Sequence, residues 1–548
     1  MLLACAITVF SLYLTLALQW DGPFRDLWEF VDDIERQFNG DWSLTYLLEA
    51  YGGAHRIFLP KLVFYADYAW FGGRNGLTIA VSLLCQCAYL AILLRVLRTQ
   101  ATFSTAERTL LASGFVLALF STGQVNNFLY AMDVQWYMSN LFGLVALAAL
   151  SQHPAATRWW LVLLAGTAAA LCNFTGLMAL PVAILVLLAT GQWQRWPLLL
   201  ALVTLCVLYV HHEKNEQQVV FSALRQSETL KTTLFIMLDT VMKMVPYILR
   251  YLASPLSREW PVAGGMLSLT GIAVLLWYWW QLWRGAALTR WQRLCLYIAS
   301  YIAASAVFTA FGRIIYPNSA VAERYQTLVL PWLPSLFGLL WPDLRRHGWL
   351  AWAWLALFGA YLLPAQLTSA RDMAILSHRV NLAHAAARAA VLEPPYINAS
   401  LSHPLIKNNI NSVKDNDAFL RANLLGYFRH LPAFALDARP SLPPGLPACA
   451  GHVVGELDAN TGTWLLNGQL LADGKPLPDI VVLQDGNVRG HGVLLRPENH
   501  LGPLAWQAAA ASRFRAFARS DRVDAQQPLQ LLGLQHGQVR CSLAASLR

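Results

Sequence analysis

Residues 20–61 read WDGPFRDLWEFVDDIERQFNGDWSLTYLLEAYGGAHRIFLPK and lie between two apolar parts of the chain. An apolar run over residues 1–18 precedes this stretch, and long apolar segments follow it. Apolar runs of such length can cross the ~30 Å hydrocarbon core of a membrane as helices. The order of apolar, polar and apolar sequence therefore indicates a polytopic membrane protein with a polar first loop.

The composition of the whole chain supports this interpretation. Of 548 residues, 56% are hydrophobic and only 13% are charged, which is unusual for a soluble protein. Several of the 22 tryptophans lie at the ends of apolar runs, where membrane proteins carry an interfacial aromatic belt. The net charge of +9 comes with no basic patch interleaved with aromatic residues outside the membrane flanks. We therefore expect membrane lipid as a partner, and no nucleic acid.

The apolar segments predict about eleven membrane helices. The first segment lacks a basic region and a small-residue cleavage site, so we interpret it as a membrane helix and not as a signal peptide. Residues 57–71 contain a proline and two charges, and we predict an interfacial or re-entrant helix there. Residues 231–253 are amphipathic and are predicted to lie on the membrane. The apolar segments are 1–19, 76–97, 109–124, 135–150, 158–172, 174–190, 196–211, 261–283, 291–311, 326–341 and 347–364.

Orientation follows from the basic residues, which gather in every second turn between the apolar segments. Such turns lie on the cytoplasmic side of a membrane. The acid-rich first loop, residues 20–75, is then outside, on the periplasmic face of a bacterial inner membrane, and the C-terminal region lies on the same side. The basic turns hold Arg95, Arg98, Arg108, Arg158, Arg195, Arg284, Arg290, Arg293, Arg345 and Arg346.

The pattern changes after residue 364. Residues 365–445 predict a helical linker, with helices at 365–393 and 415–430 and a proline-rich end. Residues 446–548 alternate short apolar segments with turn residues, which predicts a small β-sandwich. The fold class is thus mainly α: a helical membrane domain over residues 1–364 and a soluble α+β tail.

The eight cysteines divide between these parts. Six lie in apolar segments, where a free cysteine behaves as a small packing residue. Cys449 and Cys541 lie in the tail and would be able to pair in an oxidising periplasm.

Charged residues of both signs gather in two outer stretches. The first loop combines eight carboxylates with His55, Arg56 and Lys61. The turn FGRIIYPNSAVAERYQT, residues 311–327, contains two arginines. Guanidinium groups bind phosphate oxygens bidentately, so these groups together predict a phosphate site beside a carboxylate base. A solvated acidic face with snorkelling arginines is the plainer alternative.

A third stretch, STGQVNNFLYAMDVQWYMSN at residues 121–140, is polar and aromatic between two apolar runs. It suits a turn that ends a helix and lines a cavity. No Walker loop, GxGxxG, HExxH or GxSxG sequence occurs in a suitable context, which disfavours ATP-driven transport, dehydrogenase and zinc-protease functions.

The arrangement resembles the GT-C superfamily of membrane glycosyltransferases. The resemblance covers residues 1–364: an apolar first helix, an acidic first outer loop, many further spans, and the runs DLWEFVDD, AHRIFLPKL and GR with ERY. It implies a sugar donor linked to polyprenyl phosphate and an essential aspartate in the first outer loop. The tail resembles, in arrangement only, the carbohydrate-binding domains of some arabinofuranosyltransferases of this class.

The resemblance points first to Asp26 as the general base. Three further aspartates are rivals for that role: Asp21, Asp32 and Asp33. In some relatives a divalent metal binds between acids of two loops, so Mg²⁺ or Mn²⁺ is a candidate cofactor with Asp133 as a candidate ligand. The expected donor-phosphate contacts are His55, Arg56, Lys61, Arg313, Arg324 and Tyr325.

The expected reaction is inverting transfer of a sugar to a periplasmic acceptor, which is a glycan, a lipid or a protein such as pilin. Three alternatives stay open: a transporter or flippase of lipid-linked sugar, an O-antigen polymerase or ligase, and a non-catalytic glycan-binding scaffold. Charges inside the spans would favour a transporter. Most apolar segments carry none, and the charges lie in the outer turns.

Overall fold

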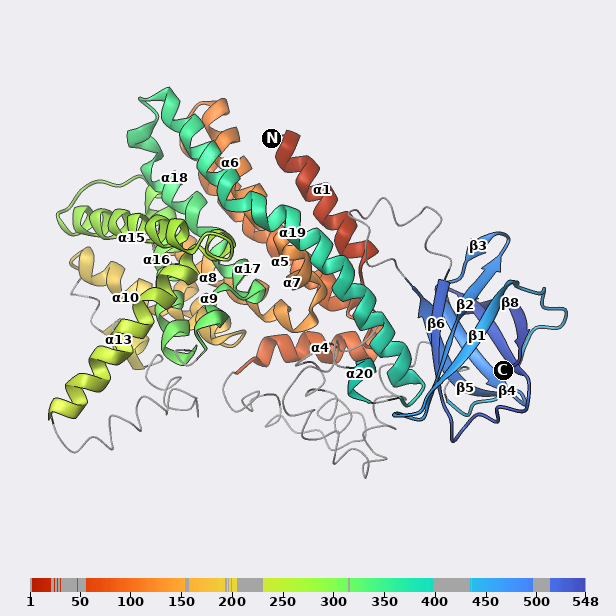
Figure 1. Ribbon diagram of the computed structural model, residues 1–548. Helices are drawn as coiled ribbons and strands as arrows, with labels where there is room; N and C mark the ends of the chain where they lie inside the picture. Colours follow the sequence, from red (N-terminus) through yellow and green to blue (C-terminus); the bar gives the residue numbers. More distant parts are fainter. Residues whose placement is uncertain are drawn as a thin grey trace.

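A helical domain forms one side of the molecule and a β-domain the other (Figure 1). The predicted helix at 415–430 and the second half of the apolar segment at 196–211 lie outside the residues that the structure describes. The computed structural model describes residues 2–20, 24, 27, 30, 47, 56–152, 157–192, 195, 197–198, 200–204, 230–313, 316–391, 393–397, 434, 436–495 and 513–547.

Most of the described chain is helical. Short 3₁₀ segments, labelled η, interrupt several of the helices. In chain order the elements are α1 (Leu2–Ala17), α4 (Phe58–Phe71), α5 (Gly76–Arg98), α6 (Thr105–Leu119), η2 (Thr122–Gln124), α7 (Val125–Leu129), η3 (Ala131–Asp133), α8 (Val134–Leu150), α9 (Trp159–Ala170), η5 (Phe174–Met178), α10 (Ala179–Ala189), α13 (Leu230–Leu252), α14 (Ser254–Ser257), α15 (Pro261–Trp283), α16 (Arg290–Arg313), η7 (Pro317–Val321), η8 (Glu323–Tyr325), α17 (Gln326–Val329), α18 (Trp332–Leu344), α19 (Gly348–Arg388) and α20 (Pro394–Ile397).

Among the described residues, five segments are long and apolar enough to cross a membrane: Gly76–Arg98, Thr105–Leu129, Pro261–Trp283, Arg290–Arg313 and Glu323–Leu344. The prediction of about eleven spans is wrong, because several apolar segments form helices that are too short. The helix α9, for example, has 12 residues. At 1.5 Å per residue it covers only about 18 Å of a ~30 Å core.

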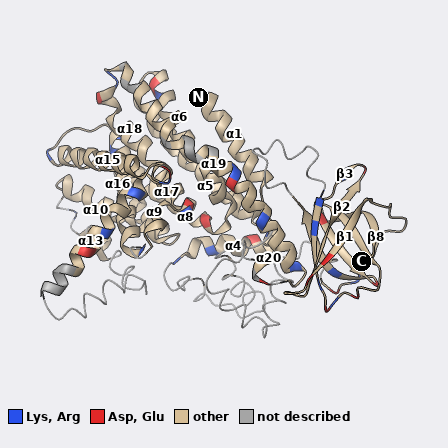
Figure 2. Cartoon of the chain, in the orientation of Figure 1, with Lys and Arg blue, Asp and Glu red and all other residues tan. Residues whose placement is uncertain are grey.

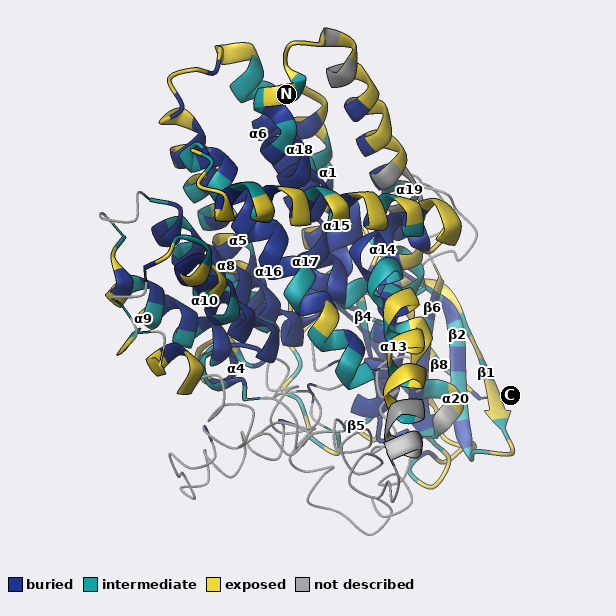
Figure 3. Cartoon of the chain, turned by 90° about the vertical axis from the view of Figure 1, so that its left-hand side faces the viewer, coloured by how far each residue is buried: buried dark blue, intermediate teal, exposed yellow. Residues whose placement is uncertain are grey.

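Aromatic packing holds the centre of the helical domain together. Trp291 of α16 and Trp332 of α18 are fully buried. Gly338 lets these helices approach, since a Cβ there would lie 2.8 Å from the sulfur of Cys295 and 3.0 Å from Nε1 of Trp291. The outer face of α15 is instead exposed and apolar (Figure 3). Such a face suits contact with lipid.

The helix α19 joins the two domains. It has 41 residues, or roughly 60 Å, and runs without a break through the predicted domain boundary at 364/365. Its C-terminal part packs on β5 and β6 of the β-domain. There Arg388, which is buried, lies 3.9 Å from the Asp479 carboxylate. The helical domain and the β-domain are therefore connected by one continuous helix.

The β-domain is one antiparallel sheet of eight strands. Their order is β1-β2-β6-β5-β4-β7-β8, with β3 paired to β2. Leucines of β2 and β7 meet in one apolar core, because the sheet curls into a half-barrel (Figure 1). The predicted β-sandwich is wrong in that no second sheet is stacked on this one in the described part. The strands are β1 (Ala450–Asp458), β2 (Thr463–Ala472), β3 (Lys475–Pro476), β4 (Asp479–Gln484), β5 (Asn487–Leu494), β6 (Arg513–Arg519), β7 (Leu529–Gln535) and β8 (Gln538–Ala545).

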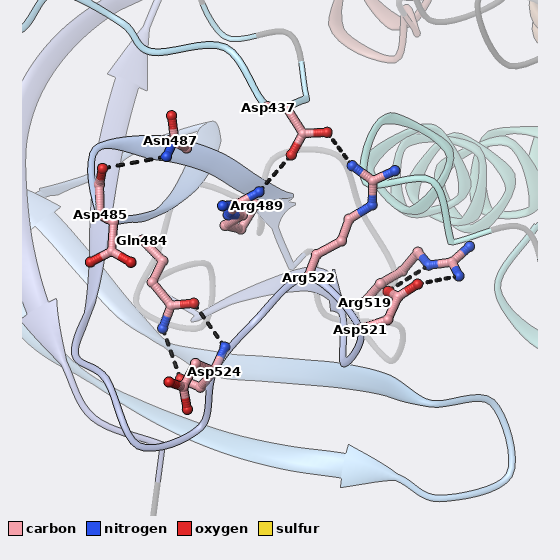
Figure 4. Close-up of polar contacts among 9 residues, drawn as sticks. All are labelled: Asp437, Gln484, Asp485, Asn487, Arg489, Arg519, Asp521, Arg522 and Asp524. Carbon is pink, nitrogen blue, oxygen red and sulfur yellow. Dashed lines mark hydrogen bonds and ion pairs between the residues drawn. The ribbon is translucent and has the colours of Figure 1, made fainter.

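Polar contacts join the segment before β1 to β5 and to the turn after β6 (Figure 4). The Asp437 carboxylate accepts hydrogen bonds from Arg489 at 2.6 Å and from Arg522. Gln484 and Asp524 exchange two hydrogen bonds, each of 2.8 Å. Because these arginines bind a carboxylate of their own domain, their charges do not indicate a phosphate-binding surface here.

A disulfide joins Cys449, just before β1, to Cys541 in β8, with the Cα atoms 5.0 Å apart. The two cysteines are separated by 92 residues. Replacing both by serine is therefore expected to reduce the stability of the β-domain by about 2–4 kcal/mol. Hydrogen exchange of the β1 and β8 amides in the full-length protein measures this. Exchange as slow as in a Cys5→Ser control, which removes a free cysteine, would contradict the prediction.

Contacts of α20 fix the β-domain against the end of α19. The Tyr396 hydroxyl donates a hydrogen bond to the Asp458 carboxylate, and the Tyr396 ring lies 5.5 Å from that of Phe517. The first of these bonds, with a second from Thr461, lowers the pKa of Asp458 below its usual 3.8. The stabilisation by this carboxylate is thus complete above the unfolded-state pKa and is lost as pH falls through the lower folded-state value.

We expect the amides of α20 and β1 to stay protected at about pH 5 and to exchange faster below about pH 3.8, after correction for intrinsic rates. In a Tyr396→Phe variant this pH-dependent step should be smaller, because the hydroxyl that lowers the pKa of Asp458 is absent. Hydrogen exchange followed by mass spectrometry measures both proteins. An identical pH profile for the two would rule out this hydrogen bond as the cause.

Candidate functional site

Two polar segments that are distant in sequence meet inside the helical domain. Asn126 of α7 donates to the Glu323 carboxylate of η8 at 2.7 Å, across 197 residues. Asn127 donates to the backbone oxygen of Glu323 at 2.9 Å and to Oγ1 of Thr327 at 2.8 Å. The polar stretch at 121–140 and the turn at 311–327, both singled out from the sequence, thus form one site.

Each segment departs from regular α-helix at this place. After α6 ends, the Thr122 backbone N–H donates to Oε1 of Gln366 at 2.8 Å, and Gln366 donates to Oγ of Ser121 at 2.6 Å. Gln366 belongs to α19. Serine and threonine offer the backbone alternatives to regular helix, and here a glutamine of another helix accepts from the freed N–H. The helix breaks are therefore part of the site.

The centre of the site is a buried network of uncharged side chains. Oε1 of Gln124 accepts from Thr327 at 2.8 Å and from the Tyr137 hydroxyl at 3.3 Å. Asn140 donates to the backbone oxygen of Thr327 at 3.1 Å. Polar groups inside membrane segments are costly and mostly functional. We call the set formed by Gln124, Asn126, Asn127, Asn140, Glu323 and Thr327 the amide cluster.

Charges border the amide cluster, although they are sparse over most of the helical domain (Figure 2). Arg258, which follows α14, lies 2.9 Å from the Glu323 carboxylate and 3.7 Å from that of Asp372 in α19. Sequence analysis identified neither Arg258 nor Asp372. The acid next to Arg258 in sequence, Glu259, is not one of these partners, so the local sequence carries no signal for the ion pairs.

Two predicted phosphate-binding arginines belong to elements around this site: Arg313 ends α16, and Arg324 lies in η8. The guanidinium of Arg324 is 5.3 Å from the centre of the Tyr325 ring. The pKa of Tyr247, on the amphipathic helix α13, is raised first by burial, and the charges of Arg313 and Arg324 oppose that rise. The structure thus puts Arg324 in contact with Tyr325 in η8, while Arg313 ends α16.

The four candidate bases, Asp21, Asp26, Asp32 and Asp33, lie outside the described residues. The same holds for His55, an expected phosphate contact. The described apolar residues of the first loop are nevertheless informative, because they share one buried cluster with the segment that follows α7. In that cluster the Phe24 and Tyr130 rings are 5.4 Å apart. The described part of the first loop therefore packs beside the segment that contributes the amide cluster.

Lys61, also predicted to bind phosphate, lies in the first turn of α4. Arg56, a further predicted phosphate contact, is half-buried and precedes Ile57, the N-cap of this helix. Lys61 is only 2% exposed, and its Nζ lies 5.6 Å from the centre of the Phe30 ring. The charge of Lys61 is thus enclosed beside the aromatic ring of Phe30.

Asp133, the candidate metal ligand, is buried at the end of η3. Its charge acts on the hydroxyl of Tyr137, which places it near the amide cluster. Within the described ranges, no three histidine, cysteine, aspartate or glutamate side chains gather in a way that would hold a metal ion. We therefore derive no step through Mg²⁺ or Mn²⁺.

Comparison with known proteins finds no matching family model, no matching curated protein and no matching solved structure. Function is therefore argued from the site, with the sequence resemblance to GT-C enzymes as an expectation.

Proposed function

We propose that the protein is a membrane glycosyltransferase that moves a sugar from polyprenyl phosphate to an acceptor on the outer side of the membrane. The observation that carries this proposal is the meeting of α7 with η8. Asn126 of α7 binds Glu323, and Arg324 is the next residue in η8. The described first-loop residues pack against α7 and the residues that follow it. Cations beside a buried polar site, in a domain with apolar outer helices, suit a lipid that ends in a phosphate and a sugar.

The proposed chemistry follows from these groups. Arg313 and Arg324 bind the donor phosphate and neutralise the charge that grows on it in the transition state. A first-loop carboxylate, with Asp26 first among the candidates, takes the proton from the acceptor hydroxyl. The acceptor oxygen bonds to the anomeric carbon as the bond from that carbon to the phosphate oxygen breaks. The lipid phosphate leaves with the electron pair, and the configuration inverts.

The β-domain has the position expected of an acceptor-binding module. Phe517 and Val493 of its outer face are buried in the same cluster as Ile397 of α20 and Phe24 of the first loop. A glycan bound to this domain would therefore be held near the first loop. The disulfide between its ends suits an oxidising compartment. We place the helical domain in a bacterial inner membrane and the β-domain in the periplasm.

One observation favours a second candidate, a transporter of lipid-linked sugar. The amide cluster lies partly within two of the five apolar segments, Thr105–Leu129 and Glu323–Leu344. Polar and ionisable residues at interrupted spans mark substrate paths in transporters. The one carboxylate of the cluster, that of Glu323, belongs to the first residue of the second of these segments.

An experiment in detergent solution distinguishes the transferase from the transporter, because transport has no measurable product where no compartments exist. Purified protein is given radiolabelled polyprenyl-phosphate sugars and candidate acceptors. A transferase forms labelled product, and Asp26→Asn abolishes it. Equal product from both proteins would reject Asp26 as the base. No product with any acceptor, together with movement of the donor across proteoliposomes, would replace the transferase by the transporter.

A further inference from the structure

The amide cluster contains buried oxygen atoms for which the described part of the chain supplies no hydrogen-bond donor. They belong to side chains that are at most 6% exposed. A buried carbonyl oxygen without a partner is costly, so such atoms call for a ligand. The atoms are Oδ1 of Asn126, Oδ1 of Asn127 and Oδ1 of Asn140, and Oε1 of Gln326, next in sequence to Thr327, is likewise unpartnered. In the same cluster, Nε2 of Gln124 is a buried donor without an acceptor in the described part of the chain.

The orientation of the three asparagine amides is fixed by their neighbours. Asn126 faces the Glu323 carboxylate, and Asn127 faces the backbone oxygen of Glu323. Asn140 faces the backbone oxygen of Thr327. Each of these partners is an acceptor, so each asparagine must present its NH₂ group to it. Exchanging the oxygen and nitrogen of any amide would set two acceptors against each other. The hydrogen bonds of the NH₂ groups therefore fix which atom of each amide is left without a partner, and that atom is the oxygen.

These oxygens decide the chemistry of the ligand. The unpartnered oxygens outnumber the unpartnered donor beside them, Nε2 of Gln124, so the site disfavours phosphate and carboxylate and favours a hydrogen-bond donor or a cation. The atoms are enclosed, which favours a species of atomic size over a sugar ring. Uncharged oxygens predominate, and the one carboxylate, that of Glu323, is already paired with Arg258. Carboxylate-rich sites suit divalent ions, whereas carbonyl oxygens replace the hydration shell of alkali ions.

We propose that the amide cluster binds one dehydrated alkali cation, Na⁺ or K⁺. The site joins α7 and α8 to η8 and α17, at the two places where apolar segments are interrupted. Non-helical segments at such depth coordinate cations in other membrane proteins. A bound ion would tie the two interrupted segments together and so fix η8, which carries Arg324. This inference does not depend on the proposed transferase activity.

The test compares thermal unfolding of the purified full-length protein in chlorides of Na⁺, K⁺ and N-methyl-D-glucamine at equal ionic strength. A ligand that binds only the folded state raises Tm with its concentration. We expect Na⁺ or K⁺ to raise Tm by about 3–6 °C at saturation relative to N-methyl-D-glucamine. Equal Tm values in all three salts would overturn the proposal, and water would then be the partner of these oxygens.

Two matched variants test whether the salt-dependent rise in Tm comes from the amide cluster. Asn140→Leu removes one free oxygen at nearly constant shape, and the salt-dependent rise in Tm is expected to shrink to less than half. Asn173→Leu is the control, because Oδ1 of Asn173 already accepts from Thr175 at 3.0 Å and its Nδ2 donates to Gln135 at 2.7 Å. A full rise in Asn140→Leu would overturn the assignment. If Asn140→Leu does not fold, saturable binding of radioactive sodium or rubidium to the wild type decides, and no such binding refutes the site.

Discussion

An Arg324→Ala variant is expected to lose about 10²–10³-fold in the rate of glycosyl transfer, because it removes one group that stabilises developing phosphate charge. Arg324→Lys should retain part of the activity, since an ammonium keeps the charge but not the planar, bidentate geometry. The measurement is transfer of labelled sugar from polyprenyl phosphate by purified protein, with kcat and KM determined separately.

The matched control is Arg284→Ala. Arg284 also lies over an aromatic ring, 4.5 Å from that of Trp280, but at the end of α15 and away from the amide cluster. Its loss removes an equivalent cation–π contact without touching the proposed site, so transfer should be unchanged. Wild-type transfer by Arg324→Ala would exclude Arg324 from the phosphate contact. Equal losses in both variants would point to a general effect of charge at the membrane surface.

Helix positions could be predicted because apolar runs are a local property of sequence. The segments at 76–97, 261–283 and 291–311 correspond to α5, α15 and α16 within a few residues. The number of spans could not be predicted in the same way, because the apolar segments at 158–172 and 174–190 form short helices. Neither α9 nor α10 exceeds 12 residues. Whether a short apolar helix spans depends on its neighbours, which a single segment does not specify.

The strands of the tail illustrate the same limit. The six alternating segments of the tail, GHVVGEL, TWLLNGQLL, IVVLQDG, VRGHGVLLRP, RFRAFARS and QVRCSLAA, correspond to β1, β2, β4, β5, β6 and β8. Alternation does not predict the two-residue β3, nor β7, whose sequence LQLLGLQ is apolar at both inward and outward positions. Its Leu531 faces the inner core, while Leu532 and Leu534 pack with Val481 in a second cluster outside. Alternation also says nothing about closure. It predicts strands equally well for two stacked sheets and for one sheet that curls.

At the site, sequence found the two polar stretches but not their partners. Residues 121–140 and 311–327 stand out because they interrupt apolar sequence. Arg258, Asp372 and Gln366 do not stand out, since their roles arise only when α14 and α19 pack beside those stretches. Asp372 and Gln366 were assigned to a linker helix, which the structure shows as part of α19.

Replacing Glu323 by alanine should both destabilise the protein and reduce transfer. The carboxylate accepts from Arg258 at 2.9 Å and from Asn126 at 2.7 Å, and alanine leaves both donors without it. Each charge-assisted hydrogen bond of this kind contributes about 1.5–3 kcal/mol to the free energy of unfolding, and less where water reaches the pair. We expect a drop in Tm of several degrees and, because η8 carries Arg324, a loss of transfer greater than the unfolded fraction accounts for.

Glu107→Ala separates these two effects. Glu107 is similarly placed, paired with Arg345 at 3.8 Å and bonded to Nε1 of Trp341 at 3.1 Å, but at the start of α6. Its loss should lower Tm comparably and leave transfer per folded molecule intact. Both the Tm and the transfer rate of Glu323→Gln should lie between those of wild type and Glu323→Ala. The amide oxygen of the glutamine still accepts from Arg258, while its NH₂ group opposes that of Asn126. If Glu323→Ala transferred sugar as fast per folded molecule as Glu107→Ala, the ion pair would only hold the helices together, and the role of η8 in placing Arg324 would be lost.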